Sequence, residues 1–559
     1  MKFSTDIIRI MEKHKGLIYL CRIRTGTEPE RKSGLKTEGG TGTGIRGEKT
    51  EVECRSASTS TTLEGRVRMI YTTKIIVART HVQREGARTC HSTRRTHWKV
   101  LRVFAVTCAF LLALGAVMTS SWLSRVPRKP DIDTNKWWGV GAPPGGAADD
   151  TIRRFKIEFN NTVVQALRSR IRERRPLTKP LEGVQSEYGM NTVYLEKILE
   201  HWQGTYDFQK RAEMLNRFDH YKTQIQGLDI HFIRAKPAQR DFQGTVLPLL
   251  LLHGWPSSSK EFDKIIPMLT TPRKGRGFVF EVVAADLPGF GFSEGTTKPG
   301  LNPVQIGVIM RNLMLRLGFQ QFYVHAGDWG AQCAMHMATL FPEHVLGFHT
   351  NMPLSSMMVS QLKIVLGAFY PSFLVDSKYL DRIYPLKNFF TYLIRESGYF
   401  HIQATKPDTI GVALTDSPSG LASYIMEKMA ICTNRDQLNT PHGGLEGLNI
   451  EDVLDTVTIA WVNSCIVTSM RLYAEGYSTK SSEISILHEI PTIVPTGAIN
   501  FRYEVVYQPD WILKDKFPNL VHSTTHDFGG HFVALEYPNE LVDDIFAATE
   551  EFLRFHASK

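Results

Sequence analysis

Cysteine is sparse in this sequence. The chain has seven cysteines in 559 residues. No two of them form a CxxC pair or a spacing typical of metal ligands, and a disulfide framework is expected in shorter, more cysteine-rich chains. We therefore expect reduced thiols and no zinc, iron–sulfur or other metal site. The cysteines are Cys21, Cys54, Cys90, Cys108, Cys333, Cys432 and Cys465.

Most of the chain also lacks an excess of positive charge. The formal net charge is +10, but residues 1–98 alone hold 20 Lys and Arg against 10 Asp and Glu. The remaining residues carry 46 of each sign and are formally neutral. The C-terminal part is therefore not expected to bind nucleic acid or another polyanion.

Regular periodicity is missing from residues 1–98. This segment is polar, basic and rich in Thr, Gly and Arg, with stretches such as GGTGTG at Gly39–Gly44. Such a composition cannot bury enough apolar surface to fold. We expect it to be disordered, or to be translated non-coding sequence attached to the gene.

Charge is absent from the segment that follows. Val103–Leu123 has 21 residues and no charged side chain, enough at about 1.5 Å per residue to cross a hydrocarbon core of about 30 Å. A cleaved signal peptide would be shorter and N-terminal. We expect a single-pass membrane anchor within residues 99–123. Basic residues lie on both sides of the span, so the positive-inside rule gives no orientation.

At 559 residues the chain is too long for one simple core. Residues 124–240 are expected to form a helical arm: Asn191–Phe218 has apolar residues near helical spacing, and Tyr221–Ile233 alternates as a hairpin around Gly227. Residues 241–353 and 485–559 read as two parts of an α/β core. Residues 354–484 are mostly helical and are expected to form a cap inserted into it.

The α/β parts alternate strand and helix, which predicts a doubly wound parallel sheet. Val246–Leu252 is a nearly continuous apolar run, as expected of a buried parallel strand. The further strands are expected at Phe278–Ala285, Phe322–Val324, Val345–Thr350, Thr492–Pro495 and Leu520–Val521, and the helices at Pro303–Leu317, Trp329–Phe341 and Glu540–Phe555.

The sharpest local signal is Ala326-Gly327-Asp328-Trp329-Gly330, between a predicted strand and a predicted helix. Small residues on both sides of a central nucleophile permit the strained turn called a nucleophile elbow. An aspartate at its centre forms an alkyl ester, so it can attack a saturated carbon that carries a leaving group, as in an epoxide or a haloalkane. Alternatively, Asp328 only caps the following helix.

An oxyanion hole is expected at Leu251-Leu252-His253-Gly254-Trp255-Pro256, where an apolar strand ends. Backbone N–H groups are suitable donors at such a place. We expect them to come from Trp255 and from Trp329, the residue after the nucleophile. His253 reads as a packed turn histidine and not as a catalytic one.

The general base is expected in Gly529-Gly530-His531-Phe532, on a late loop that can reach the elbow. His531 is preferred over His526 on the same loop and over His522, expected at the end of the last strand. The acid partner should lie between nucleophile and histidine in the chain. Glu504 and its rival Asp510 both satisfy this order, and the pattern favours Glu504.

From about Trp137 to Leu553 the chain resembles the microsomal epoxide hydrolase family, and within it the insect juvenile hormone epoxide hydrolases. The resemblance rests on long, specific strings: WWGVG, FDHYKTQIQGLDIHFI, LLHGWP, DLPGFGFS, AGDWG, ESGYFHIQATKPDT, LTDSP, FRYEVVYQPDW and GGHF. It implies an α/β-hydrolase fold with a helical cap and an N-terminal anchor. It places the catalytic glutamate on Glu504. It also places two cap tyrosines on Tyr399, in ESGY, and on Tyr473, in SMRLY.

The resemblance implies a two-step hydrolysis that needs no cofactor or metal. Asp328 attacks an epoxide carbon while Tyr399 and Tyr473 donate hydrogen bonds to its oxygen. His531, supported by Glu504, then activates water to hydrolyse the ester. The expected substrate is a small lipophilic epoxide, a juvenile hormone or a xenobiotic. The expected location is the endoplasmic reticulum or microsomal membrane, with the catalytic part in the cytosol.

Three other interpretations stay open. A haloalkane dehalogenase would share the Asp, His and acid set and would also use a Trp after its nucleophile. A lipophilic-hormone carrier with a relict site, or a structural protein on this fold, would not need a complete catalytic set. Two positions also depart from the family pattern: Ser257 and Ala326 stand where glycine is common. Both are small, so they affect the expected pocket shape and not the mechanism.

Overall fold

The computed structural model describes residues 11–14, 17–23, 52–56, 126–143, 149–237, 242–478 and 482–559. The chain divides into two units, Met1–Met118 and Thr119–Lys559. In the first unit, strands β1 (Met11–His14), β2 (Leu17–Ile23) and β3 (Val52–Ser56) pair antiparallel. These strands lie in the segment for which the sequence predicts no regular structure. Their sequences contain β-favouring residues such as Ile18, Tyr19 and Val52.

The predicted anchor Val103–Leu123 lies outside the described residues. Within the described part of the chain, no single helix has the length and hydropathy needed to cross a membrane. The adjoining helices Ile450–Val462 and Ile466–Gly476 meet that requirement only as a pair, bent by 90°.

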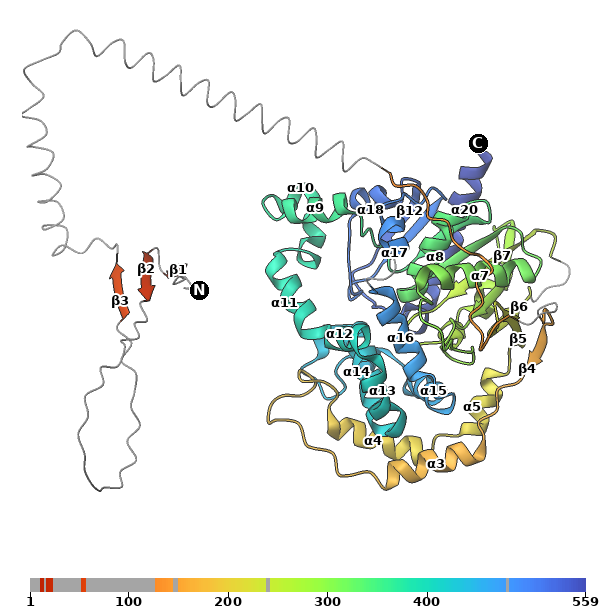
Figure 1. Ribbon diagram of the computed structural model, residues 1–559, viewed down its shortest axis with the longest axis horizontal. Coiled ribbons are helices and arrows are strands. Elements are labelled where there is room, and N and C mark those ends of the chain that lie inside the picture. Colours follow the sequence, from red (N-terminus) through yellow and green to blue (C-terminus); the bar gives the residue numbers. More distant parts are fainter. Residues whose placement is uncertain are drawn as a thin grey trace, which may run out of the picture. The chain divides into compact units, whose positions relative to one another are not determined.

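The second unit is built on a nine-stranded sheet with the order β12-β11-β10-β9-β7-β8-β6-β5-β4 (Figure 1). The strands from β12 to β8 run parallel, and β6, β5 and β4 continue the sheet antiparallel. Their bounds are β4 (Arg153–Phe155), β5 (His220–Ile225), β6 (Leu228–Ala235), β7 (Thr245–Leu252), β8 (Phe278–Ala285), β9 (Phe322–Ala326), β10 (Val345–Thr350), β11 (Thr496–Asn500) and β12 (Leu520–Thr525).

The core lies on both faces of this sheet, because side chains alternate along each strand. In β7, Leu250 and Leu252 join one apolar cluster, whereas Leu249 and Leu251 join another. The first cluster contains residues of α7 (Pro303–Arg316), α8 (Asp328–Leu340) and the cap, and the second contains residues of α6 (Ile266–Leu269) and α20 (Pro538–Ala557). The continuous apolar run of β7 is therefore explained by burial on both faces.

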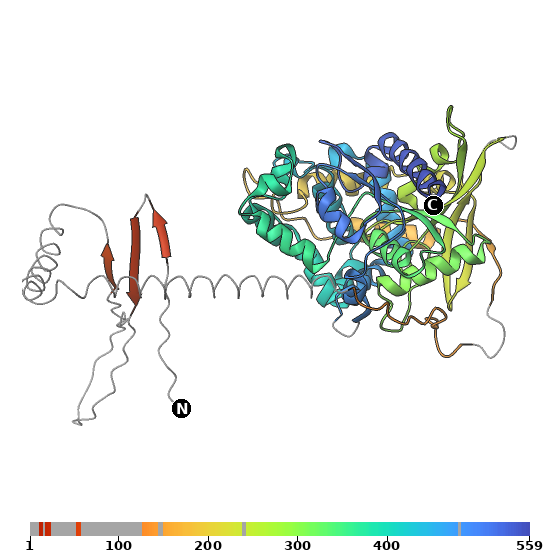
Figure 2. The same ribbon diagram turned by 90° about the horizontal axis from the view of Figure 1, so that it is seen from above.

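The cap follows β10 and returns the chain to β11. Helices α9 to α11 and strands β4 to β6 lie on opposite sides of this unit in both views (Figures 1 and 2). The cap helices are α9 (Met358–Gly367), α10 (Pro371–Leu374), α11 (Leu386–Glu396), α12 (Gly398–Thr405), α13 (Pro407–Asp416), α14 (Pro418–Asn434), α15 (Ile450–Val462), α16 (Ile466–Gly476) and α17 (Ser482–His488).

The remaining helices belong to the arm and to the last part of the core. The arm consists of α3 (Asn161–Arg172), α4 (Thr192–Gly204) and α5 (Phe208–Leu215), followed by the hairpin of β5 and β6. Helices α4 and α5 lie within Asn191–Phe218, and the chain turns at Gly227 between β5 and β6. Two short helices, α18 (Asp510–Lys516) and α19 (Val533–Glu536), flank β12 and the loop that follows it.

The strand expected at Thr492–Pro495 is wrong: β11 is Thr496–Asn500. Pro495 has no N–H to contribute to a central ladder, so the apolar stretch before it is a poor strand. The real strand contains Gly497, where an added Cβ would come within 2.8 Å of Ala548 on α20. Close packing of α20 on the sheet thus selects a small residue that a search for apolar runs overlooks. His522 likewise lies inside β12 and not at its end.

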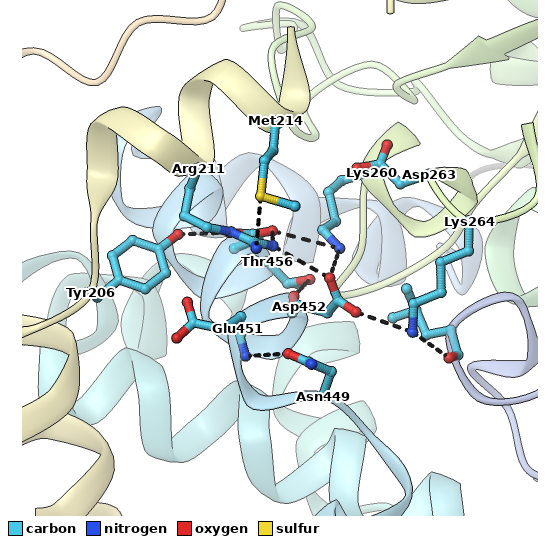
Figure 3. A network of polar contacts seen from close by, with 12 residues as sticks. Tyr206, Arg211, Met214, Lys260, Asp263, Lys264, Asn449, Glu451, Asp452 and Thr456 are labelled. Carbon is cyan, nitrogen blue, oxygen red and sulfur yellow. Dashed lines mark hydrogen bonds and ion pairs between the residues drawn. The ribbon is translucent and has the colours of Figure 1, made fainter. Parts of the chain in front are cut away.

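A buried ionic network joins the arm, the core and the cap (Figure 3). Asp455 on α15 is fully buried and accepts hydrogen bonds from the Tyr206 hydroxyl at 2.7 Å and from Arg211 Nε at 2.8 Å. Lys260, which follows β7, donates from Nζ to Asp452 at 2.8 Å and lies 3.6 Å from Asp455. Since every charge in this cluster has a partner of opposite sign, the network holds three segments far apart in sequence.

Replacing Asp455 with Ala should strongly destabilise the second unit. Removing Asp455 leaves Arg211 with only its longer contact to Asp452 at 3.4 Å, and breaking a buried ionic pair in this way costs about 3 kcal/mol. Denaturant unfolding of the purified chain should show this loss. Glu158→Ala is the matched control, because the ion pair of Glu158 with Lys156 is exposed and should change stability by less than about 0.5 kcal/mol. Equal effects of the two substitutions would contradict a holding role for the network.

Candidate active site

Asp328 occupies the turn between β9 and α8. Its φ is 46°, a left-handed conformation that non-glycine residues rarely adopt. The neighbours leave no room for larger side chains: a Cβ on Gly327 would come within 2.6 Å of Asn351, and one on Gly330 would overlap the backbone of Leu252. The N-cap of α8 is Gly327, with no side-chain capping bond. Asp328 is therefore not a helix cap, and the elbow geometry is present.

The side chain of Asp328 is held by backbone donors. The N–H of Trp255 donates to Asp328 Oδ1 at 2.7 Å, and the N–H of Trp329 also hydrogen-bonds the carboxylate. Both predicted oxyanion-hole donors thus meet at one carboxylate. Gly254 is required there, because a Cβ at this position would overlap the Asp328 carboxylate.

The other carboxylate oxygen of Asp328, Oδ2, faces His531, which in turn contacts Glu504. His531 Nδ1 is 2.6 Å from Glu504 Oε1, and His531 Nε2 is 3.6 Å from Asp328 Oδ2. The N–H of Val505 also donates to Glu504 Oε1 at 2.7 Å. Glu504 follows β11 and His531 follows β12, so the parallel register brings both to the same edge of the sheet as the elbow.

The rival residues have other partners. His522 Nε2 hydrogen-bonds Asp544 at 2.9 Å, and the ring of His526 stacks on Phe501. Asp510 accepts from the hydroxyl of Ser523 at 2.7 Å.

His253 is fully buried, and its Nε2 accepts from the N–H of Leu287 at 3.1 Å. It is the packed turn histidine that the sequence predicts.

The cap fixes the backbone position of His531. The N–H of His531 donates to the carbonyl of Cys432, on α14, at 2.9 Å. A Cβ on Gly530 would overlap that same carbonyl, so the loop can approach the cap only with glycine there. Contact with the cap therefore explains the second glycine of the pair before His531.

The charges around His531 determine its protonation. Burial lowers its pKa, but the adjoining carboxylates of Glu504 and Asp328 outweigh this and raise the pKa to about 10. Burial raises the pKa of Asp328, although His531 and the two backbone N–H groups act against it. A protonated imidazole therefore faces the carboxylate of Asp328 near neutral pH.

Two buried carboxyl groups near His531 were not predicted from the sequence. Burial raises the pKa of Glu261 to about 7 and that of Glu536 to about 8. Glu536 accepts from the N–H of Gly530 at 2.9 Å, so it supports the loop that carries His531. Ser257 hydrogen-bonds Glu261. That contact gives the serine, at a position where glycine is common, a partner in this structure.

Tyr399 on α12 and Tyr473 on α16 line the same cavity as Asp328. Their rings are 6.0 Å apart and their side chains hydrogen-bond each other. The ring of Tyr399 stacks on Trp255, and that of Tyr473 meets Trp329 edge-on. Burial, with a smaller contribution from Asp328, raises the pKa of both hydroxyls well above the usual value. Both hydroxyls therefore stay protonated and can donate hydrogen bonds. The sequence pointed to these two tyrosines only through the family resemblance.

Asp328, Trp329, Tyr399 and Tyr473 border a largely apolar cavity of about 170 Å³. A larger hollow of about 410 Å³ between the loop after β8 and α16 contains none of the candidate site residues, so the smaller cavity is the relevant one. The small cavity is lined by Pro303, Asp328, Trp329, Gln332, His336, Met352, Leu354, Ser356, Tyr399, Phe400, Tyr473, Gly476, Tyr477, Ile484, His488, Val505 and Val506. Among the described residues, no cluster of His, Cys, Asp and Glu has the makings of a metal site.

Comparison with known proteins agrees with this geometry. The family model "Epoxide hydrolase N terminus" matches residues 152–262, and "alpha/beta hydrolase fold" matches residues 248–390. A juvenile hormone epoxide hydrolase of Manduca sexta is 65% identical over 462 residues, which cover 83% of this chain and 98% of the relative. The chain belongs to the epoxide hydrolase family.

Other epoxide hydrolases support the same assignment. Epoxide hydrolase 1 of Sus scrofa is 44% identical over 416 residues, 73% of this chain and 91% of the relative. The crystal structure of juvenile hormone epoxide hydrolase from the silkworm Bombyx mori matches with a TM-score of 0.74 at 43% identity, covering 76% of this chain and all of that one. The α/β-hydrolase fold expected from the sequence is thereby confirmed.

Gly254→Ala should strongly lower epoxide hydrolase activity without unfolding the protein. The added Cβ would displace the Asp328 carboxylate from the Trp255 N–H, and loss of one such donor costs about a hundredfold in turnover or more. Steady-state kinetics with a thermal melt measures both effects. Gly277→Ala is the control, since a Cβ there meets nothing within 4 Å. Full activity in the Gly254 variant would show that the contact is unimportant.

Proposed function

We propose that this epoxide hydrolase converts a lipophilic epoxide to a vicinal diol through a covalent ester on Asp328. The proposal rests on one observation: the two carboxylate oxygens of Asp328 have different partners. Oδ1 accepts from the N–H of Trp255, while Oδ2 faces the imidazole of His531. Oδ2 is thus the atom left to attack, and Oδ1 becomes the ester carbonyl oxygen already inside its oxyanion hole.

In the first step, Asp328 Oδ2 forms a bond to an epoxide carbon and the bond from that carbon to the epoxide oxygen breaks. The oxygen becomes an alkoxide, a very basic leaving group, and it takes a proton from the tyrosine pair. Tyr399 and Tyr473 suit this role because they are protonated and border the cavity that contains Asp328. The product is a glycol ester of Asp328.

In the second step, His531 takes a proton from water and hydroxide attacks the ester carbonyl carbon. Ester formation removes the negative charge 3.6 Å from Nε2, and with it one of the causes that raise the pKa of His531. The imidazolium therefore loses its proton more readily in the intermediate than in the resting enzyme, and this proton restores, through solvent, the tyrosine that was deprotonated in the first step. The neutral imidazole is then the base that accepts a proton from water. Glu504 stabilises the imidazolium that forms again when water is deprotonated. The tetrahedral oxygen is held by Trp255 and Trp329, and the diol leaves.

For the substrate we propose a juvenile hormone. The relatives named juvenile hormone epoxide hydrolase reach 65% identity in Manduca sexta, whereas Epoxide hydrolase 1 of Sus scrofa reaches 44%. The cavity is apolar apart from its catalytic groups and a few polar side chains, which suits a terpenoid epoxide. The alternative is a broad-specificity enzyme for xenobiotic epoxides.

The His531→Gln variant should accumulate the ester and reveal the preferred epoxide. We expect steady-state turnover to fall by about a thousandfold, because the general base is lost while alkylation continues. The variant is mixed with equal amounts of a juvenile hormone and styrene oxide, and its intact mass is measured. The protein should gain the mass of the terpenoid epoxide. His526→Gln is the control and should stay active, since His526 has its ring on Phe501.

Two results would contradict this proposal. No adduct on the His531 variant would argue against a covalent ester. An adduct of styrene oxide alone would favour the xenobiotic alternative. Adding Asp328→Asn to the His531 variant should abolish the adduct, which locates the ester on the nucleophile.

We also propose that Val103–Leu123 anchors the chain in the endoplasmic reticulum membrane, with the catalytic part in the cytosol. The support is the charge-free span of 21 residues. Orientation is supported by the thiols: Cys333, Cys432 and Cys465 are free and buried, as expected in a reducing compartment.

The anchor should resist alkaline carbonate extraction, and a chain lacking residues 1–123 should be more soluble and retain activity, because no site residue lies there. Asn160-Asn161-Thr162 reports the orientation, since Asn160 is exposed and forms an acceptor sequon. In the proposed orientation it stays unmodified. A mass increase that endoglycosidase removes, and that Asn160→Gln prevents, would show the catalytic part on the lumenal side.

A further inference from the structure

The cap carries an apolar surface that lies outside both the core and the substrate cavity. It is formed by six exposed side chains of α9, α10 and the turn between them, which we call the α9–α10 face: Leu362, Val365, Leu366, Phe369, Tyr370 and Phe373. Phe369 is 77% exposed and Phe373 is 90% exposed. Single exposed apolar residues are ordinary, whereas an apolar patch marks a surface that contacts something else.

The spacing of these side chains places them on one side of the two helices. From Leu362 to Phe373 they recur every three or four residues, which is the repeat of one helix face. The other side is buried: Ile364 and Leu374 pack in a small apolar cluster with Ile512 of α18. The α9–α10 face is therefore the outer side of a well-packed element.

The composition of this segment suits the surface of a lipid bilayer. Met358–Phe373 contains one charged residue, Lys363, and no Asp or Glu. Anionic lipids of a cytoplasmic leaflet therefore meet no like charge there, and aromatic side chains favour the interface between headgroups and acyl chains. An apolar helix face that lies in the plane of a membrane is buried about 5 to 10 Å deep.

The chain that follows the proposed membrane anchor joins the catalytic unit beside the start of α9. Ile132 packs against an apolar cluster that contains Leu487 of α17. Glu489, just after α17, accepts from the N–H of Met358 at 2.9 Å. The proposed span ends at residue 123, so the chain from there to Ile132 reaches about 30 Å at most. A unit of this length has a radius of gyration of about 22 Å, so its far side is out of reach of the membrane.

We propose that the α9–α10 face lies in the interface of the bilayer that holds the anchor, as a second contact between the catalytic unit and lipid. This inference rests on the anchor proposed above, because the short connection to it favours lipid over a protein partner. Leu354 and Ser356, just before α9, line the substrate cavity. The lipid contact therefore adjoins the cavity, and a lipophilic epoxide dissolved in the bilayer is concentrated beside it.

The test places a fluorophore on the full-length chain in vesicles of phosphatidylcholine and phosphatidylserine. The cysteines before residue 124 are replaced by serine, and those of the catalytic unit are buried. Tyr370, which is 72% exposed, is replaced by cysteine and labelled with an environment-sensitive dye. Its emission should shift to the blue and be quenched by phosphatidylcholine with a nitroxide on the upper acyl chain, because the face lies about 5 to 10 Å deep.

Ile152→Cys is the matched position for the same dye. Ile152 is 43% exposed and directly precedes β4, on the opposite side of the unit from α9 (Figures 1 and 2). A dye at this position should keep the emission that it has in water and should not respond to the nitroxide lipid.

The pair Phe369→Asp and Phe373→Asp tests the contact itself. Burial of one phenylalanine changes an equilibrium constant by about tenfold or more, so this double variant should lose most of the quenching at position 370. Both side chains are exposed, so a thermal melt in detergent should be unchanged. The pair Phe369→Leu and Phe373→Leu keeps the apolar surface and should keep the quenching.

Four outcomes would overturn the inference. A dye at position 370 that stays in water, while the chain resists carbonate extraction, overturns the lipid contact and leaves the anchor intact. A dye shielded from water but not quenched by the nitroxide lipid assigns the face to a second copy of the chain or to another protein. Unchanged quenching in the Asp double variant shows that the face does not bind the lipid. Carbonate extraction of the chain overturns the anchor: quenching at position 370 in the same vesicles then supports the face as a contact on its own, and its absence overturns both proposals.

Discussion

The structure of the site depends on how the buried carboxylate of Asp328 is compensated. A buried charge without partners would take up a proton and lose its reactivity. Here one oxygen accepts a backbone N–H at 2.7 Å and the other faces a protonated imidazole at 3.6 Å. These contacts come from the loops after β7 and β12, while the nucleophile itself follows β9. The parallel register of the sheet is what brings the three loop ends to one edge.

The cap also contacts the residues that surround Asp328. The carbonyl of Cys432 fixes the backbone of His531, and the ring of Tyr399 lies on Trp255, whose N–H supports the nucleophile. On the far side, Lys260 connects the segment after that tryptophan to Asp452 in the cap. A displacement of the cap would therefore disturb both the histidine and the oxyanion hole. This coupling explains why glycine is needed at position 530, where any Cβ would push the loop away from α14.

The sequence predicted those features that depend on local pattern. β8 was placed at its observed residues because its burial on both faces makes the strand apolar except at Glu281, and Asp328 was found because its small neighbours are required by the turn itself. β11 was misplaced because its sequence reflects packing of Gly497 against α20, which no local pattern reveals. Glu504 and Asp510 could not be separated by chain order alone, since their difference is the 2.6 Å contact of one of them with His531. Glu261 and Glu536 escaped notice because their burial depends on distant segments.

In the proposed mechanism, the charge on Asp328 also connects the two chemical steps. While it is ionised, it helps keep His531 protonated, and the imidazolium in turn stabilises the nucleophile. Alkylation neutralises this oxygen, so the imidazole loses one of its two close anionic neighbours while Glu504 remains. A group with its pKa near the working pH is the best general base, and the reaction itself moves His531 in that direction. In this proposal a single buried triad holds the nucleophile in one step and activates water in the next.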